Sequence, residues 1–220
     1  MQRKMAVVLA AGTLLASFNA LAEDGNWMMR VRAVYIDWMQ ESSPVGQLGL
    51  PANDIHLEKK WAPEVDFTYF FTKNIAAELI LTYPQKHTVR VQSLASDVGS
   101  LNELPPSLIF QYHFTPEAQY RPYIGAGFNY TTYSRVDLAP LNAVTNVALP
   151  LGSPHNASID RTNLGGVLQA GVDFKVGANS YINLDLKKVY IQSDLYLDGA
   201  KISTIKGDPL LWGIGYGFRF

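Results

Sequence analysis

The sequence predicts an all-β fold, an eight-stranded antiparallel transmembrane β-barrel, from three observations. These are an alternating last segment, an N-terminus with the order of a leader, and a regular succession of short and long connections. In residues 210–220, apolar side chains occupy every second position, and mostly glycines and one arginine lie between them. Successive side chains of a strand point to opposite faces. One face of this segment is thus bulky and apolar and the other small or polar, as in a membrane strand that faces lipid and lumen. A buried terminal strand of a soluble β-protein is the alternative.

The two ends of the chain favour export. Arg3 and Lys4 precede an apolar stretch, and Ala-Leu-Ala at residues 20–22 forms a small-x-small cleavage site, which is the order of a secretory signal peptide. We expect residues 1–22 to be cleaved and residues 23–220 to form a single eight-stranded barrel in the outer membrane of a Gram-negative bacterium. Phe220, with aromatics two and four residues before it, has the form of a signal for the barrel-assembly machinery.

Composition excludes several classes of protein. A net charge of −1 leaves no basic surface for nucleic acid, and the absence of cysteine excludes a disulfide scaffold and thiol chemistry. Twelve Tyr, ten Phe and four Trp with only 17% charged residues suit a β-rich chain whose outer surface contacts outer-membrane lipid. No later segment has about twenty consecutive apolar residues, so no transmembrane helix is predicted.

The first four strands each show period-two alternation. Residues 26–39 place two arginines on one face, and residues 61–71 alternate aromatic and aliphatic side chains with Glu, Asp and Thr. Residues 75–83 carry Glu78 on the more polar face, and residues 107–114 alternate Leu, Phe and Tyr with Ser, Gln and His. Each segment therefore predicts one apolar face and one polar or mixed face.

The last four strands follow the same rule and complete the count. Residues 121–133 and 163–174 alternate bulky side chains with glycines and polar residues, and residues 181–187 alternate Ile and Leu with Asn, Asp and Lys before the final strand. Connections between the eight segments run long, short, long, short, long, short, long. This is the topology of an outer-membrane barrel, with short turns on one side and long loops on the other.

Several of these segments resemble the outer membrane protein W (OmpW) family across essentially the whole mature chain. They are residues 74–79, 104–108, 121–133, 208–209 and the Gly-Tyr-Gly-Phe-Arg-Phe ending. The resemblance implies an eight-stranded barrel with a narrow, partly hydrophobic lumen, associated with uptake of small hydrophobic molecules. Family members often carry Ser-Trp-Gly entering strand six and Trp after Asp-Pro. This chain has Asn163-Leu164-Gly165 and Leu210 at those places, which puts an aromatic constriction from those positions in doubt.

Charged residues gather on the lumen-facing positions, mostly in the half nearer the short turns. Buried charges require counter-charges or solvent, and strand one neighbours strand two. Arg30 and Arg32 are therefore expected to pair with Glu64 and Asp66, with Glu78 one strand further. A purely structural role for these pairs, without transport, is the alternative. We call the predicted set the luminal charge plug: Arg30, Arg32, Glu64, Asp66, Glu78, Asp173, Asp185 and Arg219, with Lys187 on the same face.

The same face becomes mostly apolar towards the long loops. An apolar upper lumen is predicted from Val34, Ile36, Trp38, Ile80, Ile109, Val189 and Ile191. Proline offers no N–H to a β-ladder, so prolines at one height on three neighbouring strands predict gaps in the wall, unless they merely shape the starts of loops. These lateral-exit candidates are Pro63, Pro84, Pro105 and Pro106.

The sequence predicts no catalytic residue, metal site or cofactor. His56, His87, His113 and His155 lie far apart without ligand spacing. Ser153 and His155 share a loop, but no third group that orients the base is evident. We expect passive uptake of small, mainly hydrophobic solutes with lateral exit into the lipid. The alternatives are a structural or stress-related membrane protein without transport and, third, a lipid-modifying enzyme.

Overall fold

A computed structural model describes residues 25–39, 41–149 and 154–220. The predicted signal peptide, residues 1–22, lies outside the described residues. Within them, eight antiparallel strands close into a barrel, because β9 pairs with both β8 and β11. The all-β barrel prediction is confirmed. The barrel strands are β1 (Trp27–Asp37), β4 (Lys60–Phe70), β5 (Ile75–Leu81), β8 (Ser107–His113), β9 (Tyr120–Asp137), β11 (Thr162–Lys175), β12 (Ser180–Val189) and β15 (Leu210–Arg219).

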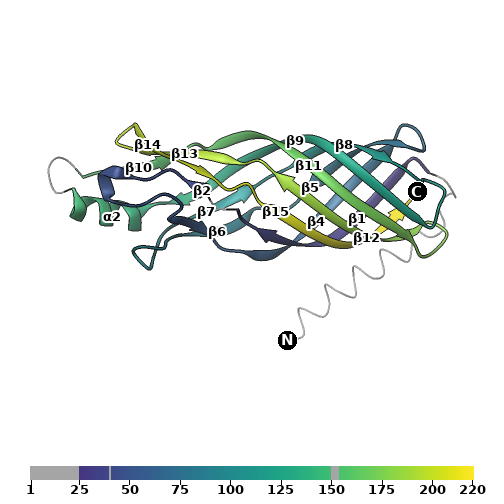
Figure 1. The fold of residues 1–220 in the computed structure, drawn as a ribbon, viewed down its shortest axis with the longest axis horizontal. Coiled ribbons are helices and arrows are strands. Elements are labelled where there is room, and N and C mark those ends of the chain that lie inside the picture. The colour runs from purple at the N-terminus through teal and green to yellow at the C-terminus, as the bar shows by residue number, and fades with distance from the viewer. Residues whose placement is uncertain (1–24, 40, 150–153) are drawn as a thin grey trace, which may run out of the picture.

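Figure 1 shows the barrel as a long cylinder with the short turns at the end that holds the C-terminus. These turns join β4 to β5, β8 to β9 and β11 to β12. Strand β1 pairs with β15 on one side and with β4 on the other, so the first and last strands close the wall as predicted. Side-chain alternation sets the two surfaces. In β8, for example, Leu108, Phe110 and Tyr112 are exposed, whereas Ile109 and Gln111 are buried.

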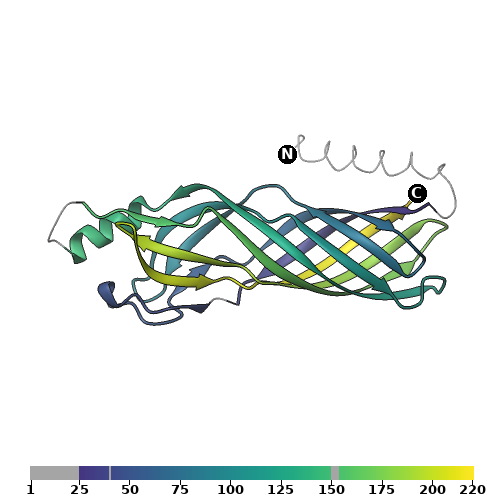
Figure 2. The ribbon, with the colours of Figure 1, turned by 90° about the horizontal axis from the view of Figure 1, so that it is seen from above.

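The long connections are structured, which the sequence did not predict. They extend the wall beyond the eight barrel strands at the end opposite the C-terminus, as Figures 1 and 2 show. Strands β6 and β7 form a hairpin that pairs with β9, and β10, β13, β14 and β2 form a second sheet. The further elements are β2 (Glu41–Ser42), η2 (Gly46–Leu48), β3 (Ile55–Leu57), β6 (Gln85–Val91), β7 (Ser96–Leu104), α2 (Ala139–Ala148), β10 (Ala157–Ile159), β13 (Gln192–Leu197) and β14 (Ala200–Lys206).

Short alternation explains these extra strands. In β6, His87, Val89 and Val91 are buried, while the residues between them are polar and point outwards. Two or three such repeats are too few to distinguish a strand from a polar loop in sequence alone. In the part of the chain that is described, no helix is long and apolar enough to cross a bilayer.

Exposed aromatic side chains mark the two membrane boundaries of the barrel. Trp27, Phe71 and Tyr120 lie near the short turns, and Trp61 and Tyr83 lie near the opposite end of the barrel wall. Such aromatic girdles flank the apolar band of outer-membrane barrels. Beyond Tyr83 the outward positions of β6 are Lys, Thr and Arg. The hairpin of β6 and β7 therefore lies outside the membrane-spanning part of the barrel.

Candidate functional site in the barrel lumen

Charged side chains fill the middle of the barrel. The strand register sets Arg30 opposite Asp66 and Arg32 opposite Glu64, so each arginine projects into the lumen beside a carboxylate. We define the ion-pair cluster as the described residues that these contacts join, three cations and five acids: Arg30, Arg32, Lys187, Glu64, Asp66, Glu78, Asp173 and Asp185.

Most contacts in the ion-pair cluster are short. Arg30 lies 2.7 Å from Asp173 and 3.2 Å from Asp66. Arg32 lies 2.7 Å from Asp66, 2.9 Å from Glu78 and 3.0 Å from Glu64. Lys187 bridges Glu64 at 2.6 Å and Asp185 at 2.8 Å. Because strands from most of the barrel contribute, the cluster ties opposite walls together.

Neutral polar groups satisfy much of what remains in the cluster. Thr68 and Asn183 accept hydrogen bonds from the two arginines, Tyr123 donates to Asp185, and Gln169 donates to Glu78 and Asp185. Arg30 and Arg32 are at most 1% exposed. An eight-stranded barrel is just wide enough for side chains to fill, so this layer closes the lumen.

Arg219 lies elsewhere than its predicted place in the charge plug. It lies at the end of the barrel that carries the short turns, where its guanidinium donates to the carbonyl of Gly25 and covers the ring of Phe70 at 4.2 Å. The physical reason is position. Arg219 is the last residue of β15 and pairs with Met28, two residues below Arg30 on β1.

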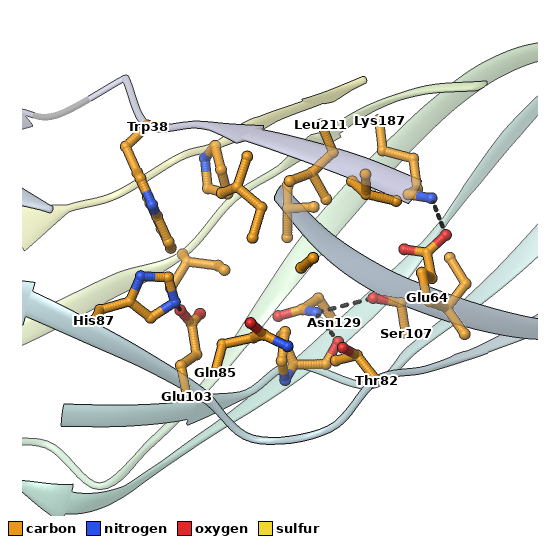
Figure 3. Close-up of a pocket in the computed structure, with 18 of the residues that line it drawn as sticks. Trp38, Glu64, Thr82, Gln85, His87, Glu103, Ser107, Asn129, Lys187 and Leu211 are labelled. Carbon is orange, nitrogen blue, oxygen red and sulfur yellow. Dashed lines mark hydrogen bonds and ion pairs between the residues drawn. The ribbon is translucent and has the colours of Figure 1, made fainter. Parts of the chain in front are cut away.

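Above the ion-pair cluster the lumen is an apolar pocket of about 60 Å³, here called the lumen pocket. Six of the seven predicted upper-lumen residues line it: Val34, Ile36, Trp38, Ile80, Val189 and Ile191. Ile109, the seventh, is fully buried and packs with Ile80 and Val167. Figure 3 shows Glu64 bonded to Lys187 at one end of this pocket, and Trp38, His87 and Glu103 together at the other.

A second apolar cavity, the outer chamber, continues the lumen outwards. It has a volume of about 70 Å³ and lies among the extended strands and α2. Its lining is almost wholly aliphatic and includes Val45, Leu50, Val91, Leu101 and Leu195. Three residues line both cavities, namely Trp38, Glu103 and Ile191. The two cavities therefore meet at Trp38.

The barrel wall is interrupted beside the lumen pocket. Pairing between β4 and β5 ends at Val65 and Leu81, and pairing between β5 and β8 ends at Ile80 and Ser107. The next ladder begins only at Gln85, in the hairpin of β6 and β7. Among the described residues, segment 82–84 therefore has no strand ladder on either side. We call this interruption the wall gap.

The prolines lie around the wall gap, but they do not interrupt every strand pair. Pro63 and Pro105 line the lumen pocket, and Pro84 is exposed in segment 82–84. The Thr82 hydroxyl donates to the Pro63 carbonyl at 3.1 Å across the gap. Towards β9, by contrast, the carbonyls of Pro105 and Pro106 accept from the Asn129 side chain at 3.1 and 3.3 Å. The gap thus opens towards β4 and not towards β9.

His87 and Glu103 form a polar group at the junction of the two cavities that sequence reasoning missed. His87 Nε2 lies 3.3 Å from Glu103 Oε2. Burial raises the pKa of the Glu103 carboxyl to about 8, although the ammonium of Lys60 opposes the rise. Burial and Lys60 lower the pKa of His87 to about 3. The two side chains are therefore neutral near pH 7 and do not form an ion pair.

The remaining candidates carry no catalytic geometry. Asp198 accepts from Nδ1 of His155 at 2.6 Å, and the Leu149 carbonyl lies 2.9 Å from Nε2. Asp198 is thus the group that could orient His155 as a base, which the sequence did not identify. Both ring nitrogens of His155 are already engaged, however, and the side chain links two outer loops. Ser153 lies outside the described residues. No group of His, Cys, Asp and Glu in the described ranges could hold a metal ion. Leu164 is 70% exposed and does not constrict the lumen.

Comparison with known proteins agrees with this architecture. Residues 23–220 match the OmpW family. The chain belongs to the OmpW family. It is 33% identical to the uncharacterised outer-membrane protein y4mB of Sinorhizobium fredii, over 88% of this chain and 80% of that protein. It is 27% identical to outer membrane protein W of Escherichia coli, over 99% of this chain and the whole of that protein.

Solved structures show the same fold. The crystal structure of OprG from Pseudomonas aeruginosa superposes with a TM-score of 0.74 at 21% identity, covering 90% of this chain and 97% of OprG. The OmpW-family chain is therefore an outer-membrane β-barrel. Its long connections face the outside of the cell and its short turns face the periplasm.

Removing Arg32 should destabilise the OmpW-family barrel strongly. Arg32→Ala leaves Glu64, Asp66 and Glu78 without their shared cation, and loss of one member of a buried ion pair costs about 3–5 kcal/mol. The control is Lys201→Ala, whose side chain is 51% exposed beside Asp194 and whose loss should cost about 0–1 kcal/mol. Urea unfolding in detergent micelles, followed by the gel shift between folded and unfolded barrel, measures both. Equal midpoints for the two variants would contradict a stabilising cluster.

The junction should make stability depend on pH. The folded pKa of Glu103, about 8, exceeds its ordinary value of 4.5, so the folded state holds a proton that the unfolded state releases. Stability should therefore fall as pH rises from about 4.5 to about 8, by about 1.4 kcal/mol per unit. His87 acts oppositely, but only below its ordinary pKa of 6.5. Between pH 7 and 8, Glu103→Gln should abolish this part of the slope. The same dependence of the free energy of unfolding on pH in wild type and Glu103→Gln, between pH 7 and 8, would refute this prediction.

Proposed function

We propose that the protein mediates passive uptake of small, mainly hydrophobic molecules across the outer membrane, with lateral exit into the lipid. The proposal is carried by one observation. An apolar pocket inside the barrel is closed below by the ion-pair cluster and is bordered at the side by the wall gap. The family resemblance implies the same class of solute.

The outer chamber supplies the first part of the proposed route. It lies on the outer side of the membrane among the extended strands, and its aliphatic lining would favour an apolar molecule by removing its surface from water. The molecule would pass Trp38 at the junction and occupy the lumen pocket. There Val34, Ile80 and Val189 present an apolar wall.

The ion-pair cluster determines where the route must turn. Passing through it would require breaking several buried ion pairs at once, each costing several kcal/mol. The wall gap requires no such step, because segment 82–84 has no ladder to break and Pro63, Thr82 and Pro105 already border the pocket. The side chains of Trp61 and Tyr83 are exposed on the lipid-facing surface of this region, at the level of the aromatic girdle. A solute leaving here would enter the outer leaflet.

A structural role without transport is the competing function, since the ion-pair cluster alone explains a tightly closed barrel. Liposomes with and without the protein distinguish the two roles. Uptake supports the proposal if a hydrophobic fluorescent probe enters protein-containing liposomes at least several-fold faster than protein-free ones. Equal rates would contradict transport and favour the structural role.

Closing the wall gap should slow uptake. Pro84→Ala combined with Pro105→Ala supplies one backbone N–H group within segment 82–84 and one at residue 105, and the strands should then pair more completely. We expect slower probe uptake and greater amide protection in β5 and β8, with Pro51→Ala, in an exposed outer loop, as the matched control. The folded gel mobility is checked first. Unchanged uptake despite the gain in amide protection would refute lateral exit.

A further inference from the structure

Several polar atoms at the junction of the lumen pocket and the outer chamber are buried without a hydrogen-bond partner. Within residues 25–39, 41–149 and 154–220, these include the indole nitrogen of Trp38, both ring nitrogens of His87 and Oε1 of Glu103. Trp38 is 5% exposed, Glu103 is 3% exposed and His87 is fully buried. A buried polar atom without a partner costs about 1–3 kcal/mol. A ligand with a polar group could form hydrogen bonds with these unpaired atoms and remove that cost.

The three side chains come from different strands and converge. Trp38 follows β1, His87 lies on β6 and Glu103 lies on β7. The rings of Trp38 and His87 meet edge to face, with their centroids 5.1 Å apart, and Glu103 lies beside His87. Figure 3 shows all three at the same end of the lumen pocket, on the side away from Lys187. Both Trp38 and Glu103 line the two cavities, so a molecule that passes between the cavities must meet them.

From this arrangement we infer that the junction is a binding site for the hydroxyl group of a small apolar alcohol or phenol. An indole N–H only donates, whereas a neutral imidazole and a carboxyl group can both donate and accept. A hydroxyl group accepts one hydrogen bond from Trp38 and donates one to the unpaired Oε1 of Glu103. Its apolar body then lies among Val34, Ile36 and Val189 in the lumen pocket.

Other ligand classes fit the junction less well. A pure hydrocarbon leaves every one of these polar atoms unpaired. An ionised ligand finds no counter-charge in the three junction side chains, because Glu103 and His87 are both neutral near pH 7. The ammonium of Lys60, the nearby cation, already donates to the carbonyl of Lys86, and burying an unpaired charge is costly. The inference rests on the proposed uptake function and deepens it, since it assigns a preferred class of solute to the same route.

Binding to the purified barrel in lipid nanodiscs tests the site without requiring transport. The probes are 1-hexanol and n-hexane, added at matched ratios of probe to lipid. The readout is the indole N–H resonance of Trp38, assigned by its loss in Trp38→Phe. We expect 1-hexanol to shift this resonance saturably, with half-saturation at a ratio about tenfold lower than for n-hexane, the difference made by one net buried hydrogen bond.

Variants of Glu103 separate a hydrogen-bonding role from packing. Glu103→Leu should weaken 1-hexanol binding about tenfold and leave n-hexane unaffected, whereas Glu103→Gln, which keeps a donor and an acceptor, should stay within about twofold of wild type. The matched control is Ser107→Ala in the same pocket, since the Ser107 hydroxyl already accepts from Asn129. If Glu103→Leu does not fold, Glu103→Met replaces it with the same expectation.

Equal half-saturation for the two probes, or undiminished 1-hexanol binding in the leucine variant, would overturn the hydroxyl site. Failure of the proposed function looks different, since it appears as equal uptake of a hydrophobic probe by liposomes with and without the protein. Preferential 1-hexanol binding would then persist at the junction despite the absence of transport.

Discussion

The buried ion-pair cluster is the constraint on which the rest of this barrel depends. Two arginines on adjacent inward positions of β1 require carboxylates from several other strands, and Arg32 alone lies within 3.0 Å of Glu64, Asp66 and Glu78. Replacing a whole buried ion pair with apolar packing changes stability little, whereas removing only one of its partners is costly. The cluster therefore acts mainly as a fixed block across the lumen, and small inward residues such as Gly215 leave room for it. A Cβ at Gly215 would lie 2.6 Å from Cγ of Arg32.

Because the lower lumen is closed, a solute in the cavities above it has no straight path through the barrel. The lumen pocket and the outer chamber have apolar linings, and they meet at Trp38 instead of continuing as an aqueous channel. The wall beside the lumen pocket lacks a ladder along residues 82–84, where Pro84 withholds an N–H. Block, pocket and gap lie in sequence from the middle of the barrel to its outer boundary. Together they favour a sideways route for an apolar solute over a straight one.

The sequence was sufficient for the parts of the fold that follow from long alternation. The eight strands, the pairing of β1 with β15 and the facing of Arg30 and Arg32 with Asp66 and Glu64 could be predicted, because side-chain direction and strand order determine them. The hairpin of β6 and β7 could not, since its alternation is brief and the sequence indicates only a long connection there. The junction was missed for the same reason. His87 and Glu103 lie on strands that fold over the barrel mouth, and only that tertiary contact brings them to Trp38. The sequence did offer one signal. Glu103 is a charged residue at an inward position of β7, in line with the apolar Leu101.

The central claim, a route that leaves through the wall, is tested most directly by closing the wall gap with a reversible bond. The register of β4 and β5, continued by two residues from Val65 and Leu81, sets Pro63 opposite Tyr83. The chain has no cysteine, so Pro63→Cys with Tyr83→Cys introduces one defined pair. Uptake of a hydrophobic probe is measured in liposomes before oxidation, after oxidation and after reduction of the same sample. The account predicts that oxidation stops uptake and that reduction restores it. Uptake by the oxidised barrel at the rate of the reduced one would contradict it.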